Sequence, residues 1–361
     1  MDTVRLNQRL ADVVPYDPKY LPADCMLSAN ESPYNIPDDI RYEIRKKLKR
    51  LDFNRYPDPL ANELRDLIAA ANGLERENVL VGNGGDEILF NTALAFGGPG
   101  KKFLNTSPTF SVYTANAFLT GTEVVDIPRL DDYRVDELGI LTRVAEGDID
   151  YIILTSPNNP TGQLVSETFI RHLLESTDAL VMVDEAYGEF SRMTCRPLLG
   201  LHKNLVILRT FSKAFSCAGV RLGYLLGDAD VISEYLKVRQ PYSVDAVSQL
   251  IGCTVYENRQ LFSPAIQDII AERGRMMEEL QTIEGIKAYP SDANFILVRM
   301  DDADVAWQQL YDQGILVRDF SHTPLLENCL RLTVGTPKEN KALLKALKRI
   351  VRTRRRDEGN D

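Results

Sequence analysis

The sequence predicts an α/β protein whose large domain has a mainly parallel mixed sheet covered by helices, next to a smaller α+β domain. At 361 residues, the chain exceeds the usual length of a single domain. Short apolar runs alternate with amphipathic stretches between about residues 79 and 226. After Gln240-Pro241 this alternation gives way to a long helical pattern and separate strand-like runs. We expect the large domain over residues 46–261 and the small domain over residues 1–45 and 262–361.

The apolar runs of the first part have the composition of strands that are buried on both faces, because most lack polar alternation and are bounded by Gly, Pro, Ser or Asp. The intervening patterns predict helices, for example Asp86–Phe96, Ser166–Glu175 and Asp228–Val238. In such a sheet the ligand binds at the carboxyl ends of the strands. The predicted strands are Val79–Val81, Lys102–Asn105, Tyr151–Thr155, Ala179–Val183, Leu205–Arg209 and Gly223–Leu226.

The second part predicts a domain in which helices and strands alternate less regularly. A long helical pattern covers about Phe262–Ile283, and two more follow at Asp304–Gln313 and Pro337–Arg352. The strand-like runs of this part are Asn294–Arg299, Ile315–Arg318 and Cys329–Val334.

Composition and charge argue against several classes of function. With 42 basic and 52 acidic residues the net charge is −10, which disfavours nucleic acid and anionic membranes as partners. The five cysteines form no CxxC pair and indicate reduced thiols in a cytoplasmic protein. The three histidines lack HxxxH and HExxH spacing, so we expect no catalytic metal. No segment has the apolar length of a signal peptide or of a membrane span, which again favours the cytoplasm.

Reactive side chains follow the predicted strands at the edge where they end. Lys213 follows Leu205–Arg209, Asp184 and Tyr187 follow Ala179–Val183, and Asn159 stands in SPNNPTG. An amine such as Lys213 can bind an aldehyde covalently and carry a proton. A carboxylate such as Asp184 can keep a pyridine nitrogen protonated, while Tyr187 and Asn159 can hydrogen-bond a ring oxygen. These groups together predict a site for pyridoxal 5'-phosphate (PLP).

A phosphate cup is predicted beside these groups. The turn GNGGDE ends the run Val79–Val81 and opens a helix, so the N–H groups of Gly85 and Asp86 can bind phosphate. Ser212 and Arg221 can add a hydroxyl and a guanidinium. Each motif alone is also explained by a turn or a helix cap. Their order along one chain is the informative observation.

The motifs SPNNPTG, VDEAYGEF and RTFSKAF…GVRLGY resemble those of fold-type-I PLP-dependent aminotransferases. Over nearly the whole length, the order of LSANESPYN, NRYPDP, VGNGGDE, SPTFSVY, SDANFILVR, GILVRDF and CLRLTVGT is similar to the histidinol-phosphate aminotransferase family. The resemblance implies a homodimer in which Tyr56 reaches the cofactor phosphate of the neighbouring subunit. It also implies that Phe110, where the family usually has tyrosine, stacks on the pyridine ring.

The resemblance further assigns substrate-binding residues. Arg331 would hold the carboxylate of glutamate and Arg318 the phosphate of the second substrate, although an arginine in a strand can also point to solvent. Tyr16 and Asn30 would close the site from the N-terminal segment, and Tyr16 could equally pack the N-terminal arm. We interpret Tyr113 and Tyr133 as structural.

The expected activity is transfer of an amino group between histidinol phosphate and 2-oxoglutarate, in histidine biosynthesis. Transamination of aromatic amino acids is one alternative, because similar sequences handle phenylalanine and tyrosine. Decarboxylation of an amino-acid phosphate is another, because it would use the same lysine, aspartate and phosphate cup. A PLP-binding regulatory module is disfavoured by the complete set of catalytic groups.

Overall fold

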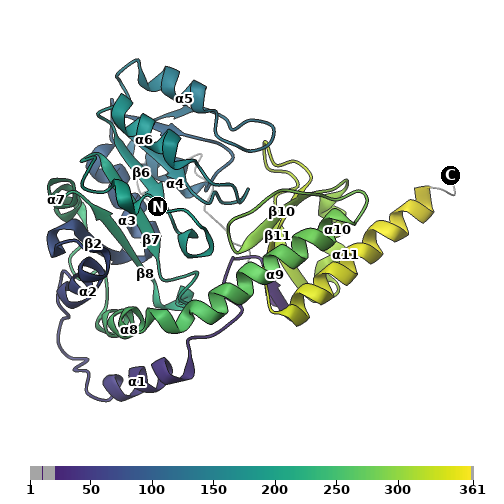
Figure 1. Cartoon of the computed structure of the whole chain (residues 1–361), viewed down its shortest axis with the longest axis horizontal. Coiled ribbons are helices and arrows are strands. Elements are labelled where there is room, and N and C mark those ends of the chain that lie inside the picture. The colour runs from purple at the N-terminus through teal and green to yellow at the C-terminus, as the bar shows by residue number, and fades with distance from the viewer. Residues whose placement is uncertain (1–9, 11–20, 359–361) are drawn as a thin grey trace, which may run out of the picture.

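The computed structural model describes residue 10 and residues 21–358, and it contains two sheets with helices packed around them (Figure 1). The larger sheet has the order β2-β8-β7-β6-β5-β3-β4. All its neighbouring pairs are parallel except those made by β8, which is antiparallel to both β2 and β7. Its strands are β2 (Val79–Asn83), β3 (Lys102–Asn105), β4 (Glu123–Asp126), β5 (Tyr151–Thr155), β6 (Leu180–Asp184), β7 (Leu205–Thr210) and β8 (Leu222–Gly227).

The reversed direction of β8 has a consequence for the site. Because β8 is antiparallel, its first residue Leu222 pairs with Asn83 at the carboxyl end of β2. On the other side Gly223 pairs with Thr210 at the carboxyl end of β7. Arg221, immediately before β8, therefore lies at the same edge as the residues that follow β2 and β7.

Helices cover both faces of this sheet, as the alternation of buried side chains shows. Leu180 and Met182 of β6 belong to one apolar cluster, whereas Val181 and Val183 belong to another. The first cluster includes residues of α3, α4 and α7, and the second includes residues of α1, α2, α5, α6 and α8. These helices are α1 (Asp38–Leu48), α2 (Asn62–Asn72), α3 (Gly84–Phe96), α4 (Val112–Thr120), α5 (Glu137–Val144), α6 (Glu167–Ser176), α7 (Ala229–Val238) and α8 (Ala246–Glu257).

The smaller sheet has the order β1-β11-β12-β10-β9, and it combines one strand from near the N-terminus with four strands from residues 287–333. The N-terminal strand β1 (Cys25–Leu27) pairs in parallel with β11 (Ile315–Asp319). The other strands are β9 (Lys287–Ala288), β10 (Phe295–Arg299) and β12 (Cys329–Thr333), all antiparallel to their neighbours. Helix α9 (Ser263–Gln281) runs from α8 toward this sheet, where α10 (Ala303–Tyr311) and α11 (Pro337–Glu358) also lie (Figure 1).

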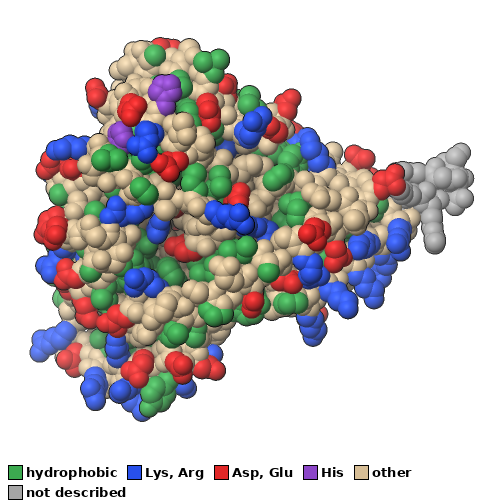
Figure 2. Space-filling view, viewed as in Figure 1, with side chains coloured by type: hydrophobic (Ala, Val, Ile, Leu, Met, Phe, Trp, Pro, Cys, Tyr) green, Lys and Arg blue, Asp and Glu red, His purple; other side chains and the backbone are tan. Residues whose placement is uncertain are grey.

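Charged side chains of both signs are mixed over most of the face in Figure 2, while lysines and arginines gather along α11. Within the described part of the chain, no helix has the length and apolar character needed to cross a membrane.

The predicted α/β class and the mainly parallel mixed sheet are confirmed. Each predicted strand corresponds to one of β2, β3 and β5–β8, and all but one of the predicted ends agree with the structure to within one residue. The division at residues 45 and 262 stays a prediction. Helix α9 begins at Ser263, close to the second boundary, whereas α1 packs on α8. Five short 3-10 helices complete the described elements: Arg76–Asn78, Gly188–Phe190, Arg196–Leu198, Ala218–Val220 and Arg259–Phe262.

Candidate active site

A cavity of about 920 Å³ lies at the carboxyl edge of the large sheet and extends to the small sheet. Its lining combines residues that follow β2, β5, β6 and β7 with residues of β11, β12 and the segment 28–31. The edge predicted to bind a ligand therefore borders a cavity. Among the described residues, no cluster of His, Cys, Asp or Glu has the composition to hold a metal ion.

Lys213 lies half-buried in the wall of this cavity, in the loop after β7. Its Nζ donates a hydrogen bond to the carbonyl oxygen of Ala29 at 3.0 Å and lies 5.9 Å from the ring centre of Tyr187. Burial, and secondly the positive charge of Arg331, lower the pKa of Lys213 to about 8. A substantial fraction of the amine is therefore neutral near pH 7–8, in the form that attacks an aldehyde.

Asp184 ends β6 and is 4% exposed. Its Oδ2 accepts a hydrogen bond from the Tyr113 hydroxyl at 2.6 Å, and its Oδ1 accepts one from the Ala186 N–H at 2.9 Å. Burial raises the pKa of Asp184 to about 6, and these two hydrogen bonds limit the rise. The carboxylate is thus mostly ionised at neutral pH, as a partner of a protonated pyridine nitrogen must be.

Tyr113 makes a second hydrogen bond, with Thr155 Oγ1 at 2.8 Å. Because Tyr113 gives its single hydroxyl proton to Asp184, the threonine is the donor in this second contact. The ring of Phe110 meets the ring of Tyr113 edge-on, with centroids 5.6 Å apart. Tyr113 therefore contacts both the carboxylate and the aromatic ring that are predicted to hold the cofactor.

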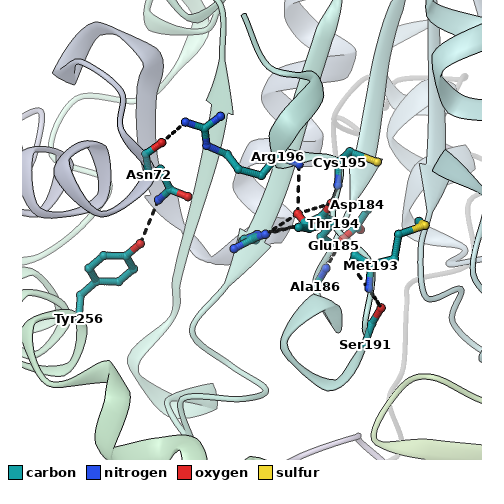
Figure 3. A network of polar contacts seen from close by, with 11 residues as sticks. Asn72, Asp184, Glu185, Ala186, Ser191, Met193, Thr194, Cys195, Arg196 and Tyr256 are labelled. Carbon is teal, nitrogen blue, oxygen red and sulfur yellow. Dashed lines mark hydrogen bonds and ion pairs between the residues drawn. The ribbon is translucent and has the colours of Figure 1, made fainter. Parts of the chain in front are cut away.

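The neighbouring Glu185 does not line the cavity and instead binds the loop that contains Thr194 and Cys195 (Figure 3). Its buried carboxylate accepts hydrogen bonds from the Cys195 N–H at 2.6 Å, from Thr194 Oγ1 at 2.8 Å and from Arg209 Nη2 at 2.7 Å. Arg196 in the same loop donates to the carbonyl of Asn72. A buried ion pair with these additional donors satisfies the charge and fixes the turn that carries Asp184.

Tyr187 and Asn159 lie on the cavity wall and contact residues of the small sheet or the N-terminal segment. The Tyr187 hydroxyl accepts a hydrogen bond from Asn30 Nδ2 at 2.9 Å. Asn30 is 1% exposed, and its Oδ1 accepts a hydrogen bond from Thr333 Oγ1 at 3.1 Å. Asn159 Oδ1 accepts from Arg331 Nη1. These contacts connect the part of the site at the large sheet with the part at the small sheet.

The predicted phosphate cup has little room for side chains. A Cβ on Gly223 would lie 2.7 Å from the backbone of Gly84 and of Gly85, and a Cβ on Gly84 would lie 2.6 Å from Arg221 Nη2. Gly84 also has a φ of +76°, which favours glycine. Arg221 Nη2 forms an ion pair with Asp86 at 2.8 Å.

Helix α3 begins at Gly84, so its first N–H groups point to this edge of the sheet. Ser212 lies on the same cavity wall. A buried carboxylate, a cavity amine, and a glycine-lined helix start beside an arginine fit the chemistry of PLP.

Two arginines of the small sheet also reach the cavity. Arg318 on β11 and Arg331 on β12 are register partners, and both line the cavity. Arg331 Nη2 donates to the carbonyl of Ser28 at 2.6 Å. Both guanidinium groups lie within 6 Å of the ring centre of Phe320.

The structure brings together most of the predicted residues, and their individual roles stay predictions. Tyr56 does not line this cavity: its side chain is 82% exposed and stacks on Tyr242 with centroids 4.6 Å apart. Tyr16 lies outside the described residues. The predicted residues that line the cavity are Asn30, Gly85, Asp86, Phe110, Asn159, Asp184, Tyr187, Ser212, Lys213, Arg221, Arg318 and Arg331.

Tyr113 is the residue that reasoning from the sequence missed. The sequence predicts a structural role for Tyr113, yet it lines the cavity and its hydroxyl donates a hydrogen bond to Asp184. The only signal in SPTFSVY was that Tyr113 stands three positions after Phe110, where the Tyr113 N–H donates to the Phe110 carbonyl at 3.2 Å in the turn that leads into α4. Helix α4, which begins at Val112, was not predicted.

The model of the family "Aminotransferase class I and II" matches residues 24–347. The chain therefore belongs to the class I and II aminotransferases. It is 43% identical over 346 residues to "Histidinol-phosphate aminotransferase 1" of Carboxydothermus hydrogenoformans, covering 96% of this chain and 98% of the relative. Within the class, the chain is accordingly a member of the histidinol-phosphate aminotransferase family.

Solved structures with the same fold include the histidinol-phosphate aminotransferase of Sinorhizobium meliloti in complex with pyridoxal-5'-phosphate. The TM-score is 0.88 at 22% identity, over 97% of this chain and 98% of that one. The L-threonine-O-3-phosphate decarboxylase of Porphyromonas gingivalis gives a TM-score of 0.79 at 24% identity, over 91% of this chain and 99% of that one. The predicted fold-type-I architecture of PLP-dependent transferases is confirmed, and the fold is shared by enzymes of more than one reaction class.

Proposed function

We propose that this aminotransferase exchanges the amino group between histidinol phosphate and 2-oxoglutarate. In the biosynthetic direction it would form histidinol phosphate and 2-oxoglutarate from imidazole acetol phosphate and L-glutamate, within histidine biosynthesis. The family membership supports the reaction class. One structural observation supports the substrate class: the cavity that contains Lys213 and Asp184 also contains two register-paired arginines, Arg318 and Arg331.

The cofactor would supply an aldehyde that accepts the amino group and a ring that withdraws electrons from the substrate α-carbon. Lys213 Nζ would bind that aldehyde, would be freed when the substrate amino group takes its place, and would then move a proton from the α-carbon as a general base. Asp184 would keep the pyridine nitrogen protonated. Asn159 and Tyr187 would hydrogen-bond the ring oxygen, and Phe110 would cover the ring face.

Gly85, Asp86, Ser212 and Arg221 would bind the cofactor phosphate, since a helix N-terminus combined with a guanidinium favours a dianion. The two arginines Arg318 and Arg331 would bind the anionic groups of the substrates, because planar guanidinium groups recognise carboxylate and phosphate oxygens. Asn30 and Tyr16 would close the site from the N-terminal segment.

A comparison of kcat/KM tests the substrate assignment. Histidinol phosphate, phenylalanine and tyrosine would each be offered with 2-oxoglutarate, and O-phosphothreonine would be tested alone for release of CO2. A preference for histidinol phosphate of about a hundredfold, equivalent to about 2.7 kcal/mol of transition-state binding, is the expected result. A preference for the aromatic acids would show that the proposed substrate is wrong. Release of CO2 without amino transfer would show that the proposed reaction class is wrong.

We also propose that the catalytic unit is a homodimer in which Tyr56 contacts the cofactor phosphate in the partner subunit. The exposure of Tyr56 and its position outside the cavity of its own chain support this arrangement. Mixing inactive Tyr56→Ala and Lys213→Ala subunits should restore about a quarter of wild-type activity, because about half of the dimers are hybrids with one complete site each. Activity that stays at the level of the separate variants would contradict the shared site.

A cytoplasmic location is proposed as well. Its support is the five cysteines, all free thiols and four of them buried, as is usual in a reducing compartment.

A further inference from the structure

The ring of Phe320 lies close to two positive charges. Phe320 follows β11 directly, and its ring centre lies 5.9 Å from the guanidinium carbon of Arg318 and 5.7 Å from that of Arg331. The two arginines are register partners on neighbouring antiparallel strands. Like charges at such positions repel each other and destabilise a sheet. A ring beside both cations offsets part of this cost through cation–π attraction.

The position of the ring is held by the rest of the small sheet. The Phe320 N–H donates to the carbonyl of Cys329 at 3.0 Å, and its carbonyl accepts from the Thr323 N–H at 2.8 Å. The side chain packs against a buried cluster that joins the large domain to the small sheet. That cluster comprises Tyr133, Tyr289, Leu297, Leu326 and Cys329.

Contact with a ring leaves a guanidinium able to bind an anion. Cation–π attraction acts through the charge and does not use the N–H donors, which lie in the plane of the guanidinium. Phe320 itself lines the cavity together with both arginines. The ring can therefore orient the two cations without occupying their hydrogen-bonding edges.

We propose that Phe320 is a positioning residue that holds Arg318 and Arg331 in the orientation of two anion-binding groups. This inference rests on the proposed function, in which both arginines bind anionic groups of the substrates. Arg331 is also held by Asn159, by Ser28 and by the ring of Phe295, 5.3 Å from its guanidinium carbon. Loss of the Phe320 ring should therefore loosen the arrangement of the two guanidinium groups relative to each other, and anion binding then has to restore it. The loss should appear in the binding of anionic substrates and not in the chemical step.

The test replaces the aromatic ring but keeps apolar volume. Phe320→Leu and Phe320→Met remove the aromatic ring, whereas Phe320→Tyr keeps an aromatic ring at this position. Phe96→Leu is the matched control. Phe96 is also half-buried and also packs on an apolar cluster, against Tyr235 at 5.4 Å, but it does not line the cavity. Folding of each variant would be checked by its melting temperature.

In the PLP-loaded enzyme, Phe320→Leu and Phe320→Met should raise KM for both histidinol phosphate and glutamate about five- to tenfold, equivalent to about 1–1.4 kcal/mol. Each kcat should stay within about twofold of wild type. Phe320→Tyr and Phe96→Leu should keep wild-type KM values. An unchanged KM in both apolar variants, a loss confined to kcat, or failure of tyrosine to rescue KM would overturn the proposal.

Titration with inorganic phosphate gives a readout that needs no turnover. The dissociation constant of inorganic phosphate, measured by calorimetry on the PLP-loaded enzyme, should rise by a similar factor in Phe320→Leu and not in Phe96→Leu. If wild type bound phosphate in this way but did not convert histidinol phosphate, the proposed substrate would be wrong while the role of Phe320 would stand. Equal phosphate binding by wild type and Phe320→Leu would refute that role even if turnover matched the proposed function.

Discussion

Replacing Tyr113 with phenylalanine removes one hydroxyl from the environment of Asp184 and leaves the rest of the side chain in place. The ring is buried in the apolar cluster between the large sheet and α3, α4 and α7, and it meets Phe110 edge-on. Phenylalanine fills the same space, so we expect the fold to persist. The lost interaction is the 2.6 Å hydrogen bond to Asp184 Oδ2.

The size of the effect follows from the geometry. A hydrogen bond to a charged group contributes about 1.5–3 kcal/mol, and about 1.4 kcal/mol corresponds to one pKa unit. Loss of the donor should therefore raise the pKa of Asp184 from about 6 to roughly 7–8. The carboxyl group would then be largely protonated at neutral pH and could no longer stabilise a protonated pyridine nitrogen. We expect PLP to bind about tenfold more weakly at pH 7, with a smaller deficit at pH 8.5, where Asp184 is again ionised.

The assay is equilibrium binding of PLP to the apoenzyme between pH 5.5 and 9, with Tyr235→Phe as the matched control. Tyr235 is buried in the same cluster, and its hydroxyl contacts Thr92 Oγ1 at 3.1 Å, outside the cavity. The low-pH midpoint of cofactor binding should move upward in Tyr113→Phe alone. If both variants bound PLP like wild type at every pH, the inferred role of the Tyr113 hydroxyl would be refuted.

Three more predictions concern the same site. Lys213→Ala should abolish transamination and the visible absorbance of the PLP-loaded protein. Substantial remaining turnover would contradict the assignment of Lys213 as the residue that binds the cofactor aldehyde. The rate at which the apoenzyme captures PLP should rise about tenfold per pH unit below pH 8 and level off above it, because Lys213 loses its proton with a pKa of about 8. Stopped-flow absorbance would measure this rate, and a rate that falls with rising pH would contradict the prediction. Gly223→Ala should lower the free energy of unfolding by about 1–3 kcal/mol and weaken PLP binding, because the new Cβ would overlap the backbone of Gly84 and Gly85. The control Gly274→Ala places its Cβ in open space within α9 and should leave thermal stability unchanged or raise it.

Much of the fold could be predicted because most of the buried strands are mainly apolar and lack polar alternation. The runs Lys102–Asn105 and Tyr151–Thr155 were predicted with the bounds of β3 and β5, since turn residues stand on both sides. The direction of β8 could not be derived from its residues, because composition distinguishes a buried strand from a helix but does not set its orientation. Strand β1 was not predicted either, since three residues show no period and its partner β11 is distant in the sequence.

In the site, too, the residues near strand ends could be predicted, whereas contacts between distant segments could not. Lys213, Asp184 and Asn159 could be predicted because each lies at or shortly after the end of a strand that could be found in the sequence. The hydrogen bond from Tyr113 to Asp184 joins α4 to β6, and the contact of Phe320 with two arginines depends on the register of β11 with β12. Such contacts depend on which segments become neighbours in space, and one sequence does not specify that. Tyr56 would complete its contact only in a second subunit.

The pairing of β1 with β11 also bears on how the protein is made. The carbonyl of Ser28 accepts a hydrogen bond from Arg331, 303 positions later, and the neighbouring Ala29 contacts Lys213. A ribosome delivers the chain from its first residue onward, so the segment around Ser28 emerges long before its partners exist. Until β11 and β12 have been synthesised, the lysine lacks the wall that surrounds it in the finished enzyme. Nascent chains and fragments that end before β11 should therefore stay inactive, because the contacts that complete the catalytic centre form last.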